Sequence, residues 1–474
     1  MKKIFSILSV LAVVLSSLSP LHPVYAEGMT DSWLSGWDYE IKDLYNDGAY
    51  IWLNRYTGTD PDVTIHGKAA VDGIRYPVCI NVTYVDDNSP YITGLNCSDN
   101  IVNLTFESAD GTPVRSSRPD RLDDMFYGME NLETVAFGGN FRGNVVQAID
   151  MFNGCVNLKS VDIENLDFGH ATVYQNMFKN CRSLKRITIS CPNGTNLSGM
   201  FSGCTSLEEA VLKGAARSAM TVSGMFSECR SLKRVDLSGM DFSEAFGFAA
   251  MFSNCQSLEA VDMSVFDFSY ALTLDDMFSG CSSLKSIDLS AATWGDDTVS
   301  AKQMFCGCGN LEEITLSEGF RPRDASDIFY VPTPSMLKVK GNVSNEFREN
   351  ALQQFESQNR YLGSIKLISK IELEGKELED NMFSISREAN DGSGRRELFN
   401  QNQHGNIVEH QVFIHTPGMH TFEVEERYVS EKVGDTPIKT IPISETPEYS
   451  CEDVIRSKTV NIVLNTDGSL SAEE

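Results

Sequence analysis

Positive charge is scarce in this sequence. Lys and Arg number 39 against 66 Asp and Glu, which gives a formal net charge of −27 at pH 7. A chain with this balance repels DNA, RNA and anionic lipid, and it tolerates basic protein partners and divalent cations. We therefore expect no nucleic-acid partner. The charge also explains solubility, so it does not by itself identify a ligand.

Long apolar runs are absent after the first residues. Residues 1–26 have the charged start, the apolar run and the small residues before a cleavage site that are typical of a secretory signal peptide, cleaved after Ala26. The run is shorter than the ~20 residues that span a bilayer. We expect a secreted or cell-surface protein with no transmembrane segment in the mature chain. No LPxTG-like signal ends the sequence, so release of the protein or a truncated reading frame is expected.

Catalytic motifs are also missing. The sequence has no GxSxG, no HExxH and no evident pair of catalytic carboxylates, and His170 is the one histidine inside the repeats described below. The histidines at 404, 410, 415 and 420 are interpreted as surface residues. We therefore expect no enzyme, no metal and no cofactor, and an extracellular hydrolase is the least favoured function.

What the sequence does contain is a repeat. The phrase MFxxC, or a close variant, occurs eight times, starting at Met125, Met151, Met177, Met200, Met225, Met251, Met277 and Met304. A period in the twenties indicates a solenoid, in which each coil buries its apolar face by stacking on its neighbours. Solenoids offer long surfaces, so the repeat favours a binding protein.

The unit from Met277 to Ser290 shows how one coil should pack. Met277, Phe278 and Cys281 have the spacing of one inward-facing helical turn, and Leu284, Ile287 and Leu289 form the LxxLxL pattern of a short strand. This predicts an α/β-type leucine-rich repeat solenoid, with a short strand and a helical turn in each coil. The eight phenylalanines should form a buried aromatic column.

Seven of the 12 cysteines lie four residues after a repeat methionine: Cys155, Cys181, Cys204, Cys229, Cys255, Cys281 and Cys308. In a solenoid their Cβ vectors are parallel, which is wrong for a disulfide. We predict that they are small buried apolar residues. The remaining cysteines, Cys79, Cys97, Cys191, Cys306 and Cys451, lie off this column and suggest no pairing.

Four aspartates occupy the middle, outward-facing position of the predicted strands: Asp162, Asp236, Asp262 and Asp288. One interpretation is a cation site or a docking stripe for a basic partner, because neighbouring strands lie ~4.8 Å apart. The other is a solvated face whose carboxylates bond to flanking turns. We favour the second, since calcium ligands usually come from loops that converge on one point.

Five segments follow from these patterns. They are the signal peptide (1–26), a β-rich N-terminal cap (27–115), the solenoid (116–335), a C-terminal helical cap (336–363) and a β-sandwich (364–474). Strands are expected at 50–53, 63–65 and 74–82. The helix that closes the last coil should start at Ser344 and end near Ser357, with Phe347 on its apolar face.

The repeats resemble the BspA-type leucine-rich repeats of bacterial surface proteins. The resemblance rests on the MFxxCxxLxxIDLS units and covers residues 33–363, with Met129 in place of the first cysteine. It implies a surface or secreted protein that binds a host protein, a matrix protein or another surface protein, as an adhesin does. A structural stalk or pilus-like component is the alternative.

Residues from 365 onward alternate as strands and resemble the isopeptide-linker domains of Gram-positive pilins. The resemblance rests on segments such as 370–378 and 418–426. In that family a lysine attacks an asparagine side chain with help from a glutamate, and Lys370 and Glu426 match the lysine and the glutamate. The family's asparagine, on a strand after the Asp467-Gly468 turn, has no counterpart. Ordinary polar roles for Lys370 and Glu426 are therefore favoured, and the domain is expected to be incomplete.

Overall fold

The computed structural model describes residues 29–341 apart from short gaps, together with Phe347 and the backbone of later strands. The gaps are residues 44–47, 82, 85–91, 94, 96–99, 118–120, 140, 143–144, 164–165, 167, 215–218, 296–298 and 334. The predicted signal peptide, Cys97 and Cys451 lie outside the described residues. Within the described part, no helix has the length and apolar character needed to cross a membrane.

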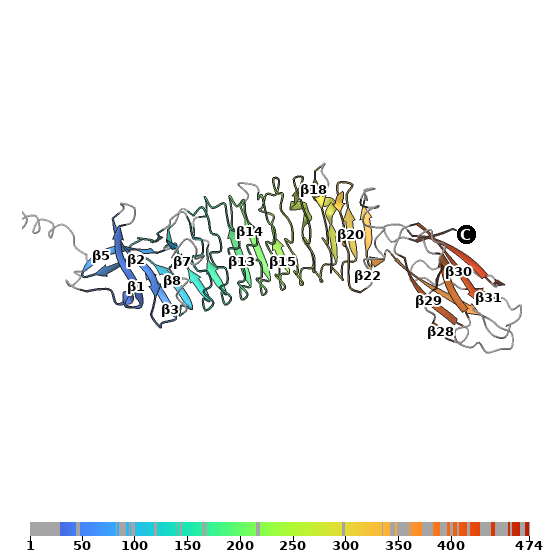
Figure 1. Cartoon of the computed structure of the whole chain (residues 1–474), viewed down its shortest axis with the longest axis horizontal. Coiled ribbons are helices and arrows are strands. Elements are labelled where there is room, and N and C mark those ends of the chain that lie inside the picture. The colour runs from blue at the N-terminus through green and yellow to red at the C-terminus, as the bar shows by residue number, and fades with distance from the viewer. Residues whose placement is uncertain are drawn as a thin grey trace, which may run out of the picture.

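The N-terminal part is a β-rich cap, at the blue end of the chain in Figure 1. After the 3-10 helix η1 (Ser32–Gly36), strands pair in the order β1-β2-β5-β9-β11, and β4 folds back on β5. The bounds are β1 (Trp37–Asp43), β2 (Ala49–Tyr56), β4 (Lys68–Val71), β5 (Ile74–Ile80), β9 (Val114–Ser116) and β11 (Phe141–Arg142), with a separate pair, β6 (Thr83–Tyr84) and β7 (Ile92–Thr93). The predicted strands are confirmed as β2, β3 (Asp62–His66) and β5. Their apolar side chains share one core with the repeats, so this part caps the first coil.

The coils stack along the long axis of the molecule, and their strands run parallel (Figure 1). The strand edge is divided into three parallel sheets. The first holds β3, β8 (Asn103–Glu107), β10 (Thr134–Ala136) and β12 (Ser160–Asp162); the second holds β13 (Arg186–Ser190), β14 (Glu209–Lys213) and β15 (Arg234–Asp236); the third holds β17 (Ser286–Asp288), β20 (Glu313–Leu316) and β23 (Lys338–Gly341). The strand ladder is therefore broken between the second and third coils and between the fifth and seventh.

Shorter pairs and turns complete the coils. They are β16 (Asp267–Phe268) with β18 (Thr293–Trp294), β19 (Val299–Ser300) with β21 (Pro322–Asp324), β22 (Ser335–Met336) with β24 (Arg360–Tyr361), and the 3-10 helices η3 (Met263–Val265) and η4 (Leu289–Ala291). On a further edge a ladder of single bridges runs unbroken from Arg121 to Ser300. The coils thus stay in register even where the strand ladder opens.

The prediction of a helical turn at each MFxxC phrase is wrong. The amide of Phe226 donates to the Met251 carbonyl of the next coil (2.8 Å), whereas the amide of Cys229 donates to the Phe226 carbonyl within its own coil (3.1 Å). Alternate amides therefore bond between coils and within the coil. A left-handed residue on each side, such as Asp276 (φ 57°) and Gly280 (φ 76°), also prevents an α-helix from forming. The phrase is a series of tight turns.

The predicted aromatic column is confirmed. Rings from Phe126 to Phe305 stack at centroid distances of 4.8 to 5.6 Å. Phe329 extends the column at 5.7 Å and belongs to a ninth coil, in which Ile328 stands where the others have methionine. The sequence pattern missed this coil because it has neither the methionine nor the cysteine. Beyond it, buried Phe347 packs against Phe320 and Phe329; the rest of the predicted helix, 344–357, lies outside the described residues.

The prediction that the column cysteines are small buried residues is confirmed. Their thiols also have a second role, as hydrogen-bond donors. All seven column cysteines are buried, and none of them forms a disulfide. Each thiol donates to the phenylalanine carbonyl of the preceding coil, as Cys255 does to Phe226 (3.1 Å). Burial raises the pKa of most of these thiols, so they keep the proton that makes this bond. In these seven coils the position therefore combines a small side chain with a hydrogen-bond donor.

The chain after residue 361 forms two five-stranded sheets. One has the order β28-β29-β25-β31-β32 and the other β27-β26-β30-β33-β34. The bounds are β25 (Gly363–Ile371), β26 (Phe383–Glu388), β27 (Arg396–Leu398), β28 (Asn402–His404), β29 (Ile407–Ile414), β30 (Gly418–Glu426), β31 (Ile438–Thr440), β32 (Val454–Ile455), β33 (Ser457–Leu464) and β34 (Leu470–Glu473). The strand expected to be missing after the Asp467-Gly468 turn is present over four residues as β34, paired with β33.

Candidate binding surface

The residues that define the repeat are withdrawn from solvent. The methionine, phenylalanine and cysteine of each phrase are buried from the second coil to the eighth. Outward strand positions, by contrast, differ from coil to coil and are partly or fully exposed, as at Thr188, Val211 and Asp236. Any ligand must therefore meet the variable strand face or the loops.

The four predicted aspartates do not form one ladder. Asp162 ends β12 in the first sheet, Asp236 ends β15 in the second, and Asp288 ends β17 in the third, while Asp262 lies before η3 and outside any strand. The breaks in the strand ladder separate them.

Three of these aspartates bond to a serine two residues on. Oδ1 of Asp236 accepts from the amide (3.0 Å) and the hydroxyl (2.6 Å) of Ser238, and Asp262 and Asp288 do the same with Ser264 and Ser290. The serine bonds hold the pKa of Asp236 and Asp262 below its usual range. No group of three or more metal-ligating side chains occurs among the described residues. These carboxylates thus fix the turns that follow their strands, while their free lone pairs still present negative charge to solvent.

The two residues matched to an isopeptide site are placed on strands of different sheets. Lys370 lies on β25 and Glu426 at the end of β30. Only the backbone is described here, so their side chains lie outside the described residues.

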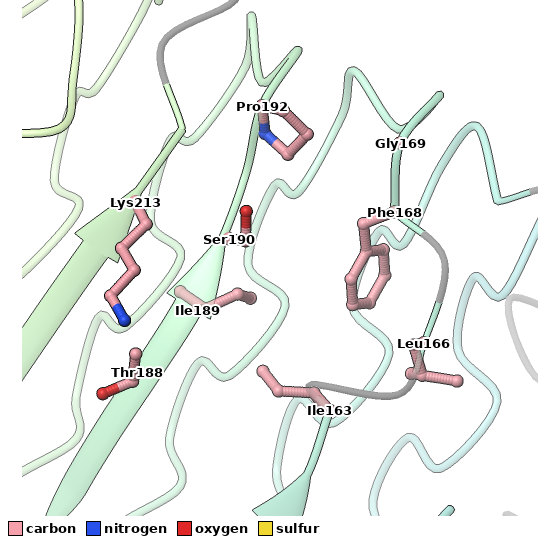
Figure 2. A pocket seen from close by; sticks show the side chains of 9 residues that line it. All are labelled: Ile163, Leu166, Phe168, Gly169, Thr188, Ile189, Ser190, Pro192 and Lys213. Carbon is pink, nitrogen blue, oxygen red and sulfur yellow. The ribbon is translucent and has the colours of Figure 1, made fainter. Parts of the chain in front are cut away.

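A groove opens where the strand ladder breaks between the second and third coils. It has a volume of about 460 Å³. Figure 2 shows Ile163 and Phe168 of the second coil on one side and Ile189 of β13 on the other, with Lys213 of β14 at the rim. A second hollow of about 440 Å³ adjoins it and shares Ile163 and Thr188. Together they offer an apolar floor with hydroxyl and charged groups around it.

The groove exists because the third coil is short. Its phrase is followed by the next after 23 residues instead of 26, and it lacks the Asp-Phe pair that the second coil has at Asp167-Phe168. The carbonyl of Cys191 accepts from the amide of Gly194. In the second coil the carbonyl of Phe168 accepts from the amide of Ala171 in the same way, so Cys191 and Phe168 have equivalent places in their turns. Cys191 is buried, and Pro192 beside it lines the groove together with Phe168. The short period was the signal in the sequence that could have pointed to this place.

The local charge around the third coil is positive, opposite in sign to the net charge of the molecule. Residues 168–207 contain no Asp or Glu, but they contain Lys179, Arg182, Lys185 and Arg186. Arg186 is exposed and lies 3.9 Å from Glu209, too far and too solvated for a strong ion pair. The groove therefore lies at the edge of a cationic band in an otherwise acidic protein.

The repeat region matches the model of the BspA-type leucine-rich repeat region. The matched segments, 122–259, 221–328 and 248–360, together span about half of the chain. The chain belongs to the BspA-type leucine-rich repeat family. Such repeat arrays generally serve as binding scaffolds, and proteins of this family are typically at the bacterial surface or secreted.

Two solved structures are similar to this family member. A leucine-rich cell surface protein from Faecalibacterium prausnitzii A2-165 is 18% identical, with 69% of this chain and 97% of that chain covered and a TM-score of 0.29. A leucine-rich repeat protein from Bacteroides ovatus ATCC 8483 is 15% identical, with 64% and 98% covered and a TM-score of 0.27. No curated protein matches the chain. The family assignment rests on the repeat match.

Proposed function

We propose that this BspA-type protein is exported through residues 1–26 and binds a host, matrix or other surface protein through its repeat array. The observation that carries the proposal is the division of each coil. The repeated residues are buried, and the exposed strand positions change from coil to coil. A surface that varies on a fixed scaffold supports recognition rather than catalysis.

Within this array the groove beside Phe168 is the proposed docking site for a side chain of the partner. Its apolar floor would exclude water from an aliphatic or aromatic group, and Lys213 would attract a neighbouring carboxylate. Asp162, Asp236, Asp262 and Asp288 remain a candidate stripe for basic groups elsewhere on the strand face.

The test measures binding of the full mature chain to purified extracellular-matrix proteins by surface plasmon resonance. Lys213→Glu reverses the charge at the groove and is expected to weaken binding about tenfold. Lys233→Glu makes the same change in net charge on an exposed residue of the fifth coil and should have little effect. Equal losses in both variants, or no binding of any matrix protein, would count against the proposal.

The C-terminal sheets support a second candidate function, a stalk in which this part is a spacer. We propose that the two five-stranded sheets form a β-sandwich of the isopeptide-linker type, because their strands alternate along the sequence as that fold requires. If Lys370, assisted by Glu426, forms an isopeptide bond with an asparagine side chain, the side-chain amide nitrogen leaves as ammonia and the intact mass of the purified chain is lower by one ammonia. An unmodified mass would remove the cross-link from the stalk hypothesis.

A further inference from the structure

An apolar stripe crosses the fourth, fifth and sixth coils in the loops between their strands and the next MFxxC phrase. It consists of Met220, Phe246, Leu272 and the neighbouring Tyr270, whose side chains are 44%, 39%, 62% and 66% exposed. Isolated exposed apolar residues are common on protein surfaces, but a contiguous row marks an interaction surface.

Backbone hydrogen bonds make the row contiguous. The amide of Phe246 donates to the Met220 carbonyl (3.0 Å), and the amide of Leu272 donates to the Phe246 carbonyl (3.0 Å). Phe246, Leu272, Tyr270 and Glu244 line one open hollow of about 460 Å³. Two apolar side chains, one phenol ring and one carboxylate therefore face the same space.

The segment that carries Phe246, Tyr270 and Leu272 is acidic. Residues 235–284 contain no Lys, Arg or His, and their acidic residues are Asp236, Asp241, Glu244, Glu259, Asp262, Asp267, Asp275 and Asp276. A cation, Arg323, lies at the Leu272 end of the stripe, where its guanidinium donates to the Leu272 carbonyl (3.5 Å). An acidic partner would be repelled here, and a basic one attracted.

We propose that this stripe binds a basic amphipathic helix of a partner protein. An arginine or lysine of the helix occupies the hollow, with its cation over the Tyr270 ring and near Glu244, and with its methylene stem along Phe246 and Leu272. Apolar residues on the same helix face meet the stripe as far as Met220. The cation belongs at the Glu244 side, because Arg323 repels it from the other.

The spacing of the coils supports a helix as the occupant. Stacked rings of these coils are 5.4 to 5.5 Å apart, which measures the coil repeat. An α-helix has a pitch of about 5.4 Å. A helix lying along the stack therefore presents successive turns of its apolar face to successive coils.

The test uses two synthetic helical peptides of equal length and equal leucine content, one with arginine and one with glutamate at all other positions. Binding to the full mature chain is followed by fluorescence anisotropy at physiological salt. The arginine peptide should bind, and the double variant Tyr270→Ser, Leu272→Ser should weaken it about tenfold or more. Ile74→Ser, which removes an exposed apolar residue of the N-terminal cap, is the matched control and should leave affinity unchanged.

A second pair of variants separates a site from diffuse attraction. Glu244→Gln should weaken the arginine peptide about threefold. Glu259→Gln makes the same change in net charge outside the hollow and should not. Equal effects of these two variants, unchanged binding by the double variant, or equal affinity for both peptides overturns the inference. A dimer of the free chain that the double variant disrupts does so too, because a second copy would then cover the stripe.

The inference extends the proposed binding function to a second surface. It rests on that function only in assigning the array to protein recognition. If matrix proteins bind normally to the double variant while the arginine peptide fails to bind the native chain, the proposed function stands and the stripe has another role. If the arginine peptide binds the native chain but no Lys213-dependent binding of matrix proteins is found, the stripe is supported and the proposed function of the groove is not.

Discussion

Two edges of each coil differ in how regularly they continue from coil to coil. The turn edge carries the MFxxC turns, and the strand edge carries the strands. On the turn edge, rings stack at 4.8 to 5.7 Å from Phe126 to Phe329. On the strand edge the ladder is broken twice into three sheets. The comparison shows that the coils stay in register where the strand ladder opens, because the ring stack and the ladder of single bridges continue there. The strand edge is then free to vary in sequence, to open into a groove and to change its charge.

The largest expected effect comes from alkaline pH and the thiols of the turn edge. Burial raises the pKa of Cys155, Cys181, Cys229, Cys255 and Cys281. In the unfolded chain thiols ionise near pH ~8.5, so above this pH the unfolded state loses protons that the folded state keeps. The free energy of unfolding should fall by about 1.4 kcal/mol for each thiol per pH unit, or about 7 kcal/mol for all five at pH ~9.5.

Urea unfolding at a series of pH values, followed by circular dichroism, measures this slope. Replacing Cys255 by Ala should make the slope shallower by one thiol. A stability that does not change between pH ~7.5 and ~9.5 would show that the column thiols ionise readily in the folded state.

Truncating the aromatic column should have the next largest effect. Phe226→Ala removes a ring stacked on both sides and should lower the free energy of unfolding by about 4 kcal/mol. Val211→Ala on the half-buried strand face should lose less than about 1 kcal/mol. Similar losses in urea unfolding would remove the distinction between the two edges.

The left-handed turn residues should matter less than the rings but remain measurable. Gly280 has φ 76°, and an added Cβ would lie 2.3 Å from the Asn254 side-chain oxygen. Gly280→Ala should therefore cost about 1–2 kcal/mol. Gly309 has nothing within 4 Å of an added Cβ, so Gly309→Ala is the control and should leave the melting temperature nearly unchanged. A matching drop in both variants would argue against a conformational role for Gly280.

The smallest effect is expected on the strand edge, at Asp262. Asp262→Ala removes the acceptor for Ser264, but the carboxylate is exposed and water competes for both bonds, so the loss should be about 0.5 kcal/mol at neutral pH. Because the pKa of Asp262 is lowered by folding, its contribution is present above pH ~3.9 and is lost as the pH falls. Asp262→Asn keeps an acceptor and should recover most of the loss. A cost above that of Gly280→Ala in chemical unfolding would mean that the strand edge also holds the coils together.

Much of the fold could be predicted from particular residues. Met277, Phe278 and Cys281 repeat with a period that indicates stacked coils, and their burial follows from that repeat. The helical turn could not be excluded from apolar spacing, because tight turns also place these residues inward. The glycine, asparagine and aspartate residues before the methionine and the cysteine, such as Asp276 and Gly280, carried the missing information, since they favour left-handed backbone.

The candidate surfaces were less predictable. Asp162, Asp236, Asp262 and Asp288 share a place in the repeat, but the ladder breaks separate them. The groove lies where the strand ladder opens between β12 and β13, and the sequence alone does not show which strands pair. The apolar stripe depends on Tyr270 and Glu244 of successive coils facing one hollow.

By itself, the sequence determined a stacked repeat with a buried Met-Phe-Cys edge, free cysteines and an acidic exterior, because these follow from a short period and from composition. Only the tertiary structure decided where the coils separate, which exposed residues become neighbours and which thiol bonds to which carbonyl. The reason is physical. Residues about 26 apart in the chain come within contact distance only when the coils stack, and small differences in coil length then determine which positions close and which remain open.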